Sequence, residues 1–259
     1  MERGFDDAVR RIVEARKTLA YMEGLPEPGA PATLADGYRM QKAAVERWDD
    51  RIAGWKVGAT AKQMQDVFGI SEPVCGPVFA KTVFQSPAVL PARRFHHLML
   101  ETEFTLRFGE DLPARAAPYS RNEIVAAIDA VVPSFELISP RFRKLPADKI
   151  AHVVADFNAN GGAVLGPVCE RWRELDLPSH AVKLFIGGTL RQEGSGALVL
   201  GDPLNVAEWL VNTLRAQGLS IAQGEFVMTG TMTGLHAVEI GQRAVADFGG
   251  LGKVEVEFC

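Results

Sequence analysis

Two glutamates separated by one residue give the sequence its clearest chemical signal. Glu101 and Glu103 stand in the segment LETEF, where apolar and polar residues alternate with a period of two. In a β-strand, side chains at positions i and i+2 point to the same face, so the two carboxylates share a face and Phe104 takes the other. Neighbouring carboxylates repel each other unless they are solvated, share a proton or bind a cation. The pattern therefore indicates either a solvent-facing strand or a cation site.

A third glutamate strengthens the case for a cation site. Glu136 lies in SFELIS, where the flanking Phe135 and Leu137 take the opposite face. A carboxylate inside an otherwise apolar strand needs a partner. Carboxylate oxygens are hard ligands that suit Mg²⁺, Mn²⁺ or Ca²⁺. Three such acids, with coordination positions left open for water or substrate, would form a catalytic rather than a structural site.

Lys56, in the segment GWKVG, is the candidate cationic group. Its neighbours Trp55 and Val57 take the other face of an expected strand. A lysine in a partly desolvated pocket can move a proton, bind a substrate carboxylate or form a Schiff base. A surface lysine with an exposed ammonium group is the structural alternative.

Two turns also carry polar groups that could line a pocket. The segment VMTGTMTG, residues 227–234, ends an expected strand, and its backbone N–H groups and hydroxyls can hold a carboxylate. It is not a phosphate-binding loop, because no Gly-Lys-Ser/Thr follows. In VVADFNANGG, Asp156 and Asn158 are either turn formers or pocket residues.

The elements that must position these groups follow from periodicity and capping signals. Amphipathic helices are expected over residues 5–22 and 33–48, followed by a strand over 52–59. Ser120 and Glu123 form a capping box that predicts a helix through about Ala130, ended by Pro133. Asp202 and Pro203 begin a helix that ends at Gly218. Glycine turns at 187–188 and 249–252 predict two hairpins. The chain is thus expected to be α+β, with a mainly helical part over residues 1–80 that contributes Lys56 and a β-rich catalytic part over 81–259.

Composition excludes several classes of function. The formal net charge is −4 with no long run of like charge, so there is no electrostatic footprint for nucleic acid. The three cysteines are widely spaced and form no zinc pattern. No apolar stretch reaches the ~18 residues of a membrane span, and the charged start MERGFDDAVR is not a signal peptide. A cytoplasmic protein that does not bind membranes is expected.

Taken in order, the segments GWKVGAT, LETEF, SFELISPR, VVADFNANGG, VMTGTMTG and ADFGGLGKVEVEF resemble those of 2-keto-4-pentenoate hydratases. These are grouped with 4-oxalocrotonate decarboxylases in the fumarylacetoacetate hydrolase superfamily. The resemblance runs from about residue 10 to the end of the chain. It implies a twisted mixed β-roll with an N-terminal helical part, and a homo-oligomer.

The resemblance also implies roles for individual residues. Glu101 and Glu103 match the metal-binding pair, and Glu136 matches the third ligand of Mg²⁺ or Mn²⁺. Lys56 matches a lysine that reaches the substrate, as catalytic and substrate-binding group. Asp156 matches an aspartate that is a second acid/base candidate. Thr231 matches a hydroxyl residue that faces the substrate carboxylate.

The implied reaction is the addition of water to 2-hydroxypenta-2,4-dienoate, or a close 2-oxo acid, to give a 4-hydroxy-2-oxo acid in aromatic catabolism. Decarboxylation of a 4-oxalocrotonate-type dicarboxylate is the alternative, because Phe157 and Asn160 depart from the family's usual Asp-Asn-x-Ser-Ser. A C–C bond hydrolase would need an N-terminal histidine–glutamate pair, and no histidine precedes His96. A non-catalytic scaffold is the last alternative. A complex with a partner enzyme of the same pathway is also typical of the family.

Overall fold

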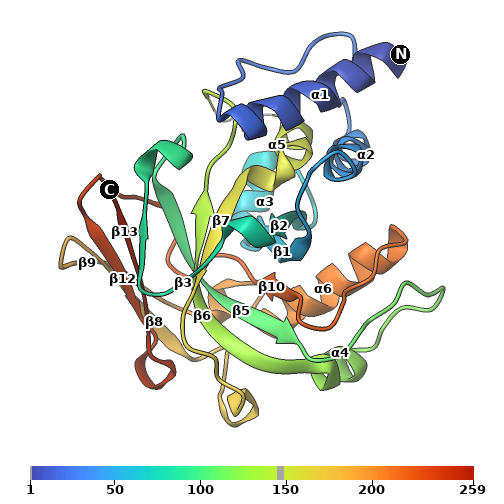
Figure 1. Ribbon diagram of the computed structural model, residues 1–259. Helices are drawn as coiled ribbons and strands as arrows, with labels where there is room; N and C mark the ends of the chain where they lie inside the picture. Colours follow the sequence, from blue (N-terminus) through green and yellow to red (C-terminus); the bar gives the residue numbers. More distant parts are fainter. Residues whose placement is uncertain (1, 145–148) are drawn as a thin grey trace.

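Two β-sheets form the body of the protein, seen in a computed structural model that describes residues 2–144 and 149–259 (Figure 1). The larger sheet has the strand order β2-β1-β10-β5-β6-β7-β3, with the short β11 paired to β5. The second sheet has the order β4-β13-β12-β8-β9. The strands are β1 (Ile52–Gly58), β2 (Val74–Phe79), β3 (Val83–Gln85), β4 (Ala88–Leu90), β5 (Met99–Phe108), β6 (Ile128–Ile138), β7 (Asn160–Leu165), β8 (Ala181–Ile186), β9 (Thr189–Ser195), β10 (Phe226–Met228), β11 (His236–Ala237), β12 (Arg243–Asp247) and β13 (Lys253–Phe258).

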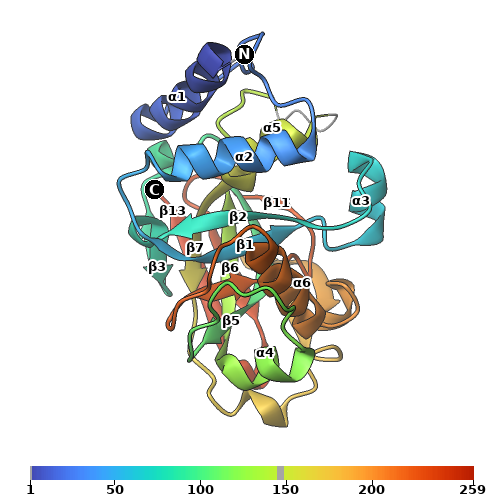
Figure 2. The same ribbon diagram turned by 90° about the vertical axis from the view of Figure 1, so that its right-hand side faces the viewer.

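Three of the α-helices lie together. They gather at one end of the larger sheet, above β1 and β2, as both ribbon views show (Figures 1 and 2): α1 (Glu2–Thr18), α2 (Leu34–Val45) and α5 (Ile150–Ala155). The others are α3 (Lys62–Phe68), α4 (Arg121–Ala127) and α6 (Pro203–Ala216). The mixture of helices and two sheets confirms the expected α+β class. None of the described helices is long and apolar enough to cross a membrane.

The larger sheet has two faces with different roles. Phe104 and Phe135 point toward the second sheet and join a large apolar core between the two layers, to which α6 contributes Leu210. Val78 and Ala163 point the other way, into a smaller cluster on the concave side. We call these the outer and the inner face of the sheet. Because β2 also approaches β7, the sheet curls until its two flanks meet around the inner face.

Capping and turn chemistry account for most element boundaries. Thr33 and Ser120 both form the predicted capping boxes, and Asp202 caps α6 at Leu204. The two predicted hairpins are present as β8–β9 and β12–β13. Helix α1 ends at Thr18, earlier than predicted, because Leu19 adopts a positive φ of 55° that cannot continue a right-handed helix.

The predicted helix over residues 120–130 is wrong at its C-terminal end. Helix α4 stops at Ala127, and Pro133, expected to end that helix, lies inside strand β6. Burial explains the difference, since Val131 and Val132 are buried in the sheet and their β-branched side chains favour extended backbone. The carbonyl of Pro133 still accepts a hydrogen bond from Gly166, so the ring removes only a donor.

The division of the chain near residue 80 stays a prediction, but the larger sheet contains strands from both sides of this position. β1 and β2 precede this position. β1 pairs in parallel with β10, with Lys56 opposite Met228. Lys56 therefore enters the site from within the larger sheet.

We predict that Phe104→Ala destabilises the protein by about 3–5 kcal/mol, because it leaves a cavity in the core between the sheets. Phe104 is fully buried there. Ile240→Ala is the control, since Ile240 is 67% exposed and its truncation should change stability by less than about 0.5 kcal/mol. Urea denaturation followed by circular dichroism measures both, and equal midpoints would contradict the assigned core.

Candidate metal centre and active site

Strand register brings the three predicted glutamates together on the inner face. β5 and β6 are antiparallel, with Glu101 opposite Glu136 and Glu103 opposite Ser134. One carboxylate oxygen from each glutamate lies within 4.8 Å of the others. Glu103 and Glu136 are fully buried, whereas Glu101 is partly exposed. The solvent-facing interpretation of the E-x-E segment is therefore wrong, and the open side of the cluster is at Glu101.

Three donors hold this cluster in place. The Lys56 Nζ lies 3.2 Å from the Glu136 Oε1, and Lys56 is only 4% exposed, which excludes a surface lysine. The side-chain amide of Asn160 donates to the same oxygen at 2.9 Å. The backbone N–H of Gly230 donates to the Glu103 Oε2 at 2.8 Å. Each donor comes from a different segment, so the site forms only when β1, β7 and the loop after β10 are all in place.

The turn at residues 227–234 does hold a carboxylate, but it is the protein's own Glu103. Gly230 has a φ of +97°, and a Cβ added there would lie 2.3 Å from the Thr60 Oγ1. Only glycine fits this close approach. Sequence reasoning did not single out Gly230, although its position between two threonines in a glycine-containing turn is a usable signal.

Burial raises the pKa of all three acids, and repulsion between carboxylates adds to this effect at Glu101 and Glu103. Burial and then Glu136 raise the pKa of Glu101 to about 7. Burial, followed by the charges of Glu136 and Glu101, raises the pKa of Glu103 well above its usual value. Burial also raises the pKa of Glu136, against the lowering effects of Lys56 and Asn160. For Lys56, burial lowers the pKa, but the carboxylates, Glu136 first, outweigh it and raise the pKa overall.

The donor set fits a divalent cation. Glu103 Oε1 and Glu136 Oε2 are buried and have no hydrogen-bond partner among the described residues. Unpartnered buried carboxylate oxygens are costly unless a proton or a cation compensates them. One lysine cannot neutralise three carboxylates. Glu101, Glu103 and Glu136 would thus hold a hard cation, and the partly exposed Glu101 leaves its solvent side accessible to a ligand.

Asp156 lies away from these three acids, in an ion pair with the N-terminal helix. Its Oδ1 accepts from the Arg16 Nε at 2.6 Å, and its Oδ2 accepts from the backbone N–H of Arg141 at 2.7 Å. Arg16 also donates to the carbonyl of Asn160 at 2.9 Å. With both oxygens occupied, Asp156 is arranged to position the segment that carries Asn160. Its acid/base role stays a prediction.

The other residues singled out in the sequence are split between site and core. Thr231 follows Gly230 and remains partly exposed, with its hydroxyl donating to the carbonyl of Gly234 at 3.0 Å. Asn160 belongs to the cluster. Phe157 does not: its ring is fully buried against Phe79 and Trp48. Of the two departures from the family pattern, only Asn160 therefore touches the acidic site.

Known proteins match this chain over most of its length. The family described as fumarylacetoacetate (FAA) hydrolase C-terminal matches residues 53–258. A 2-keto-4-pentenoate hydratase of Dechloromonas aromatica is 30% identical over 89% of this chain and 88% of its own. A 4-oxalocrotonate decarboxylase of Pseudomonas putida is 30% identical over 87% and 86%. The structure of a 4-oxalocrotonate decarboxylase from Pseudomonas putida G7, complexed with magnesium and adipate, superposes with a TM-score of 0.88 and 27% identity, covering 100% of this chain and 98% of that one.

We predict that Mg²⁺ stabilises the wild-type protein and that Glu103→Gln abolishes this effect. In EDTA the variant should melt at the same temperature as the wild type or higher, because one of three repelling buried acids has become neutral. Adding Mg²⁺ should raise the melting temperature of the wild type only, since a ligand stabilises the state that binds it.

Glu257→Gln is the matched control, as Glu257 is a strand glutamate on β13 in the other sheet. It should respond to Mg²⁺ as the wild type does. An unchanged Mg²⁺ response in Glu103→Gln, measured by calorimetry of thermal unfolding, would contradict the ligand assignment.

Proposed function

Because this chain belongs to the fumarylacetoacetate hydrolase family, we propose that it is a lyase that hydrates 2-hydroxypenta-2,4-dienoate or a close 2-oxo acid. The observation that carries the proposal is the buried group of Glu101, Glu103 and Glu136 with Lys56 bonded to it. Hydratases from several bacteria are similar to it over most of their length. The proposed cation is Mg²⁺ or Mn²⁺.

The reaction needs a site that stabilises an enol-type anion and controls two protons. Converting the dienol to the conjugated ketone moves the hydroxyl proton to C5; water then adds its oxygen at C4 and a proton at C3. The bound cation would supply Lewis-acid polarisation of the 2-oxo oxygen. The chain's own residues must provide the proton transfer and the orientation.

Lys56 is the proposed proton-moving and carboxylate-binding group. Its raised pKa keeps the amine protonated among the carboxylates, so it can donate a proton or pair with a substrate carboxylate. A Schiff base would need a neutral amine, which this acidic surrounding disfavours. Thr231 and the adjoining turn are proposed to orient the substrate carboxylate. Asp156 is proposed to position Asn160. It accepts from Arg16, and Arg16 in turn donates to the carbonyl of Asn160.

Decarboxylation of a dicarboxylate analogue is the second candidate. It is favoured by the similarity to 4-oxalocrotonate decarboxylases in sequence and structure. The C–C hydrolase alternative lacks the N-terminal histidine–glutamate pair that it would need to activate water, since no histidine precedes His96. His96 instead stacks on Tyr21 with ring centroids 3.8 Å apart. The three buried acids and Lys56 likewise argue against a non-catalytic scaffold.

The proposal extends to the setting of the enzyme. A cytoplasmic homo-oligomer in aromatic catabolism, with a partner enzyme that passes on the unstable dienol, is proposed from the family resemblance. Size-exclusion chromatography with light scattering tests the oligomeric state directly.

We predict metal-dependent loss of the dienol absorbance when freshly generated 2-hydroxypenta-2,4-dienoate is mixed with the protein and Mg²⁺ or Mn²⁺. EDTA should abolish the reaction, and the product should be 4-hydroxy-2-oxopentanoate, identified by mass spectrometry. If the dienol persists while 2-oxo-3-hexenedioate loses carbon dioxide in the same buffer, the enzyme is a decarboxylase.

We further predict that Lys56→Met lowers kcat by about 10²–10⁴-fold, the usual contribution of a positioned proton donor or acceptor. Mg²⁺ affinity should be retained, because the three carboxylates remain. Lys62→Met is the control, since Lys62 is exposed and, among the described residues, forms an ion pair only with Asp66 on α3. Steady-state kinetics with isothermal titration of Mg²⁺ separates the two effects. Full activity in Lys56→Met would overturn its proposed role.

A further inference from the structure

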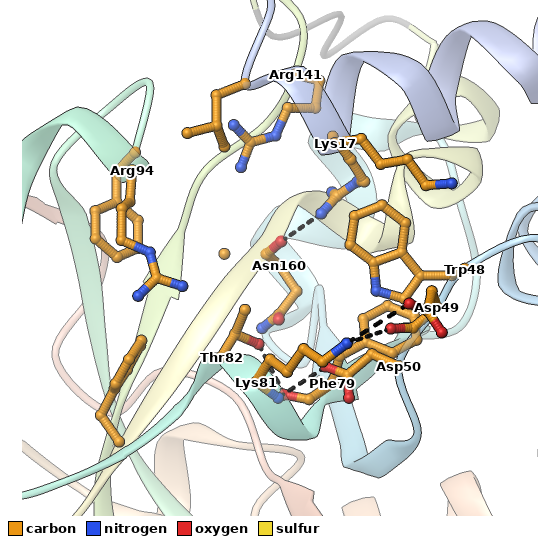
Figure 3. Close-up of a pocket in the computed structure, with 15 residues that line it drawn as sticks. Lys17, Trp48, Asp49, Asp50, Phe79, Lys81, Thr82, Arg94, Arg141 and Asn160 are labelled. Atoms are coloured by element: carbon orange, nitrogen blue, oxygen red, sulfur yellow. Dashed lines mark hydrogen bonds and ion pairs between the residues drawn. The ribbon is translucent and has the colours of Figure 1, made fainter.

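A cavity lies beside strands β2, β3 and β7 of the larger sheet. Its volume is about 540 Å³, within the range of small-molecule sites. Figure 3 shows Arg94 and Arg141 extending into it, across from Trp48. Aromatic rings form much of its wall: Trp48, Phe79, Phe84 and Phe95. The exposed side chain of Leu19 lies at its rim, so the cavity is open to solvent.

Side chains alternate between the two faces of a strand, and this alternation separates Phe79 and Phe84, which line the cavity, from the three glutamates. On β3, Val83 packs with Ala163 on the inner face, and the next residue, Phe84, points outward and lines the cavity. On β2, Val78 is on the inner face and Phe79 is on the cavity side. Phe79 and Phe84 therefore line the cavity from the face opposite the carboxylates, and Asn160 is shared by the cavity and the acidic cluster.

Arg141 is the unusual group in the cavity. Its side chain is only 4% exposed, yet its Nε and Nη1 have no hydrogen-bond partner within residues 2–144 and 149–259. Only Nη2 is bonded, to the Ser139 Oγ at 3.2 Å. Burial and then the charge of Arg16 lower the pKa of Arg141 to about 10, so the guanidinium is still charged at neutral pH. A buried charged donor of this kind requires a partner.

The acids near the cavity are already paired. Asp156 bonds to Arg16, and Asp50 accepts from the backbone N–H of Lys81. The Asp49 Oδ2 lies 4.0 Å from the Lys81 Nζ. Arg94 lies over the Phe84 ring at 5.4 Å and has no carboxylate partner in the described part of the chain. Two guanidinium groups are thus left to face the same space.

We propose that this cavity is a second ligand site that binds a small organic acid, with its carboxylate on Arg141 and its flat apolar body against the aromatic wall. The planar Arg141 guanidinium lines the cavity and is incompletely paired, and such a group matches a carboxylate. The ring of Trp48 and the phenylalanines match an unsaturated or aromatic body. The inference is independent of the proposed reaction, because it uses none of the residues of the acidic site as ligands.

The bound acid would contact the segment that supports the metal centre. Asn160 lines the cavity, accepts from Arg16 through its carbonyl and donates to Glu136 through its side chain. An acid bound in the cavity would therefore influence the position of Glu136 through Asn160.

Benzoate is the probe, and benzamide is its nearly isosteric neutral control. Isothermal titration of the full protein in EDTA, where the acidic cluster repels anions, should show one benzoate site per chain. Benzamide should bind at least about tenfold more weakly, since it lacks the charged bond to Arg141. Oxalate added with Mg²⁺ should not displace benzoate. Absence of saturable benzoate binding, or its displacement by oxalate and Mg²⁺, would overturn the proposal.

The variants Arg141→Met and Arg143→Met form a matched pair. Arg143 lies in the same loop but pairs with Glu23 and does not line the cavity. Arg141→Met should weaken benzoate binding at least about tenfold, and Arg143→Met should leave it unchanged. Equal binding in the two folded variants would refute the site.

Should Arg141→Met fail to fold, Arg94→Met serves instead, because Arg94 is exposed and its removal buries no unpaired group. A loss of about threefold or more in benzoate affinity would support the site, and unchanged affinity would refute it.

Discussion

Repulsion among three carboxylates in a buried place is the constraint on which the rest of this structure depends. Glu103 and Glu136 have no contact with solvent, and Glu101 is only partly exposed. A folded chain can tolerate this only if other groups compensate the charge. Lys56, the backbone of Gly230 and the amide of Asn160 do so in part. The negative charge that remains uncompensated makes the site fit a divalent cation. Selection for stability alone would not keep three such carboxylates together.

The sequence was informative where a feature is local. Period-two alternation placed Glu101 and Glu103 on one face, and the capping boxes at Thr33 and Ser120 marked two helix starts correctly. The assembly of all three glutamates with Lys56 came from the family resemblance, since nothing in the spacing relates residue 56 to residue 136. Local signals failed where burial decided, as at Pro133, which a sheet accommodates because only its missing N–H is lost.

The ion pair between Arg16 and Asp156 could not be predicted from the sequence. Arg16 and Asp156 are separated by 140 residues and lie in segments with no shared pattern. Their bond joins helix α1 to the segment that leads into β7, and through it the N-terminal helices are connected to Asn160. The helical part is therefore a support for the site, as well as a cover over β1 and β2 (Figure 2).

The parallel pairing of β1 with β10 has a consequence for the order of events in folding. Gly54 to Lys56 align with Phe226 to Met228, so the centre of the larger sheet joins residues that are far apart along the chain. Closing so long a loop is entropically costly, and non-local pairing slows folding. During synthesis, Lys56 leaves the ribosome long before its neighbouring strand. β1 can pair with β2, and β5 with β6, but the edges of β1 and β5 that flank β10 stay open until residues 226–228 have been made.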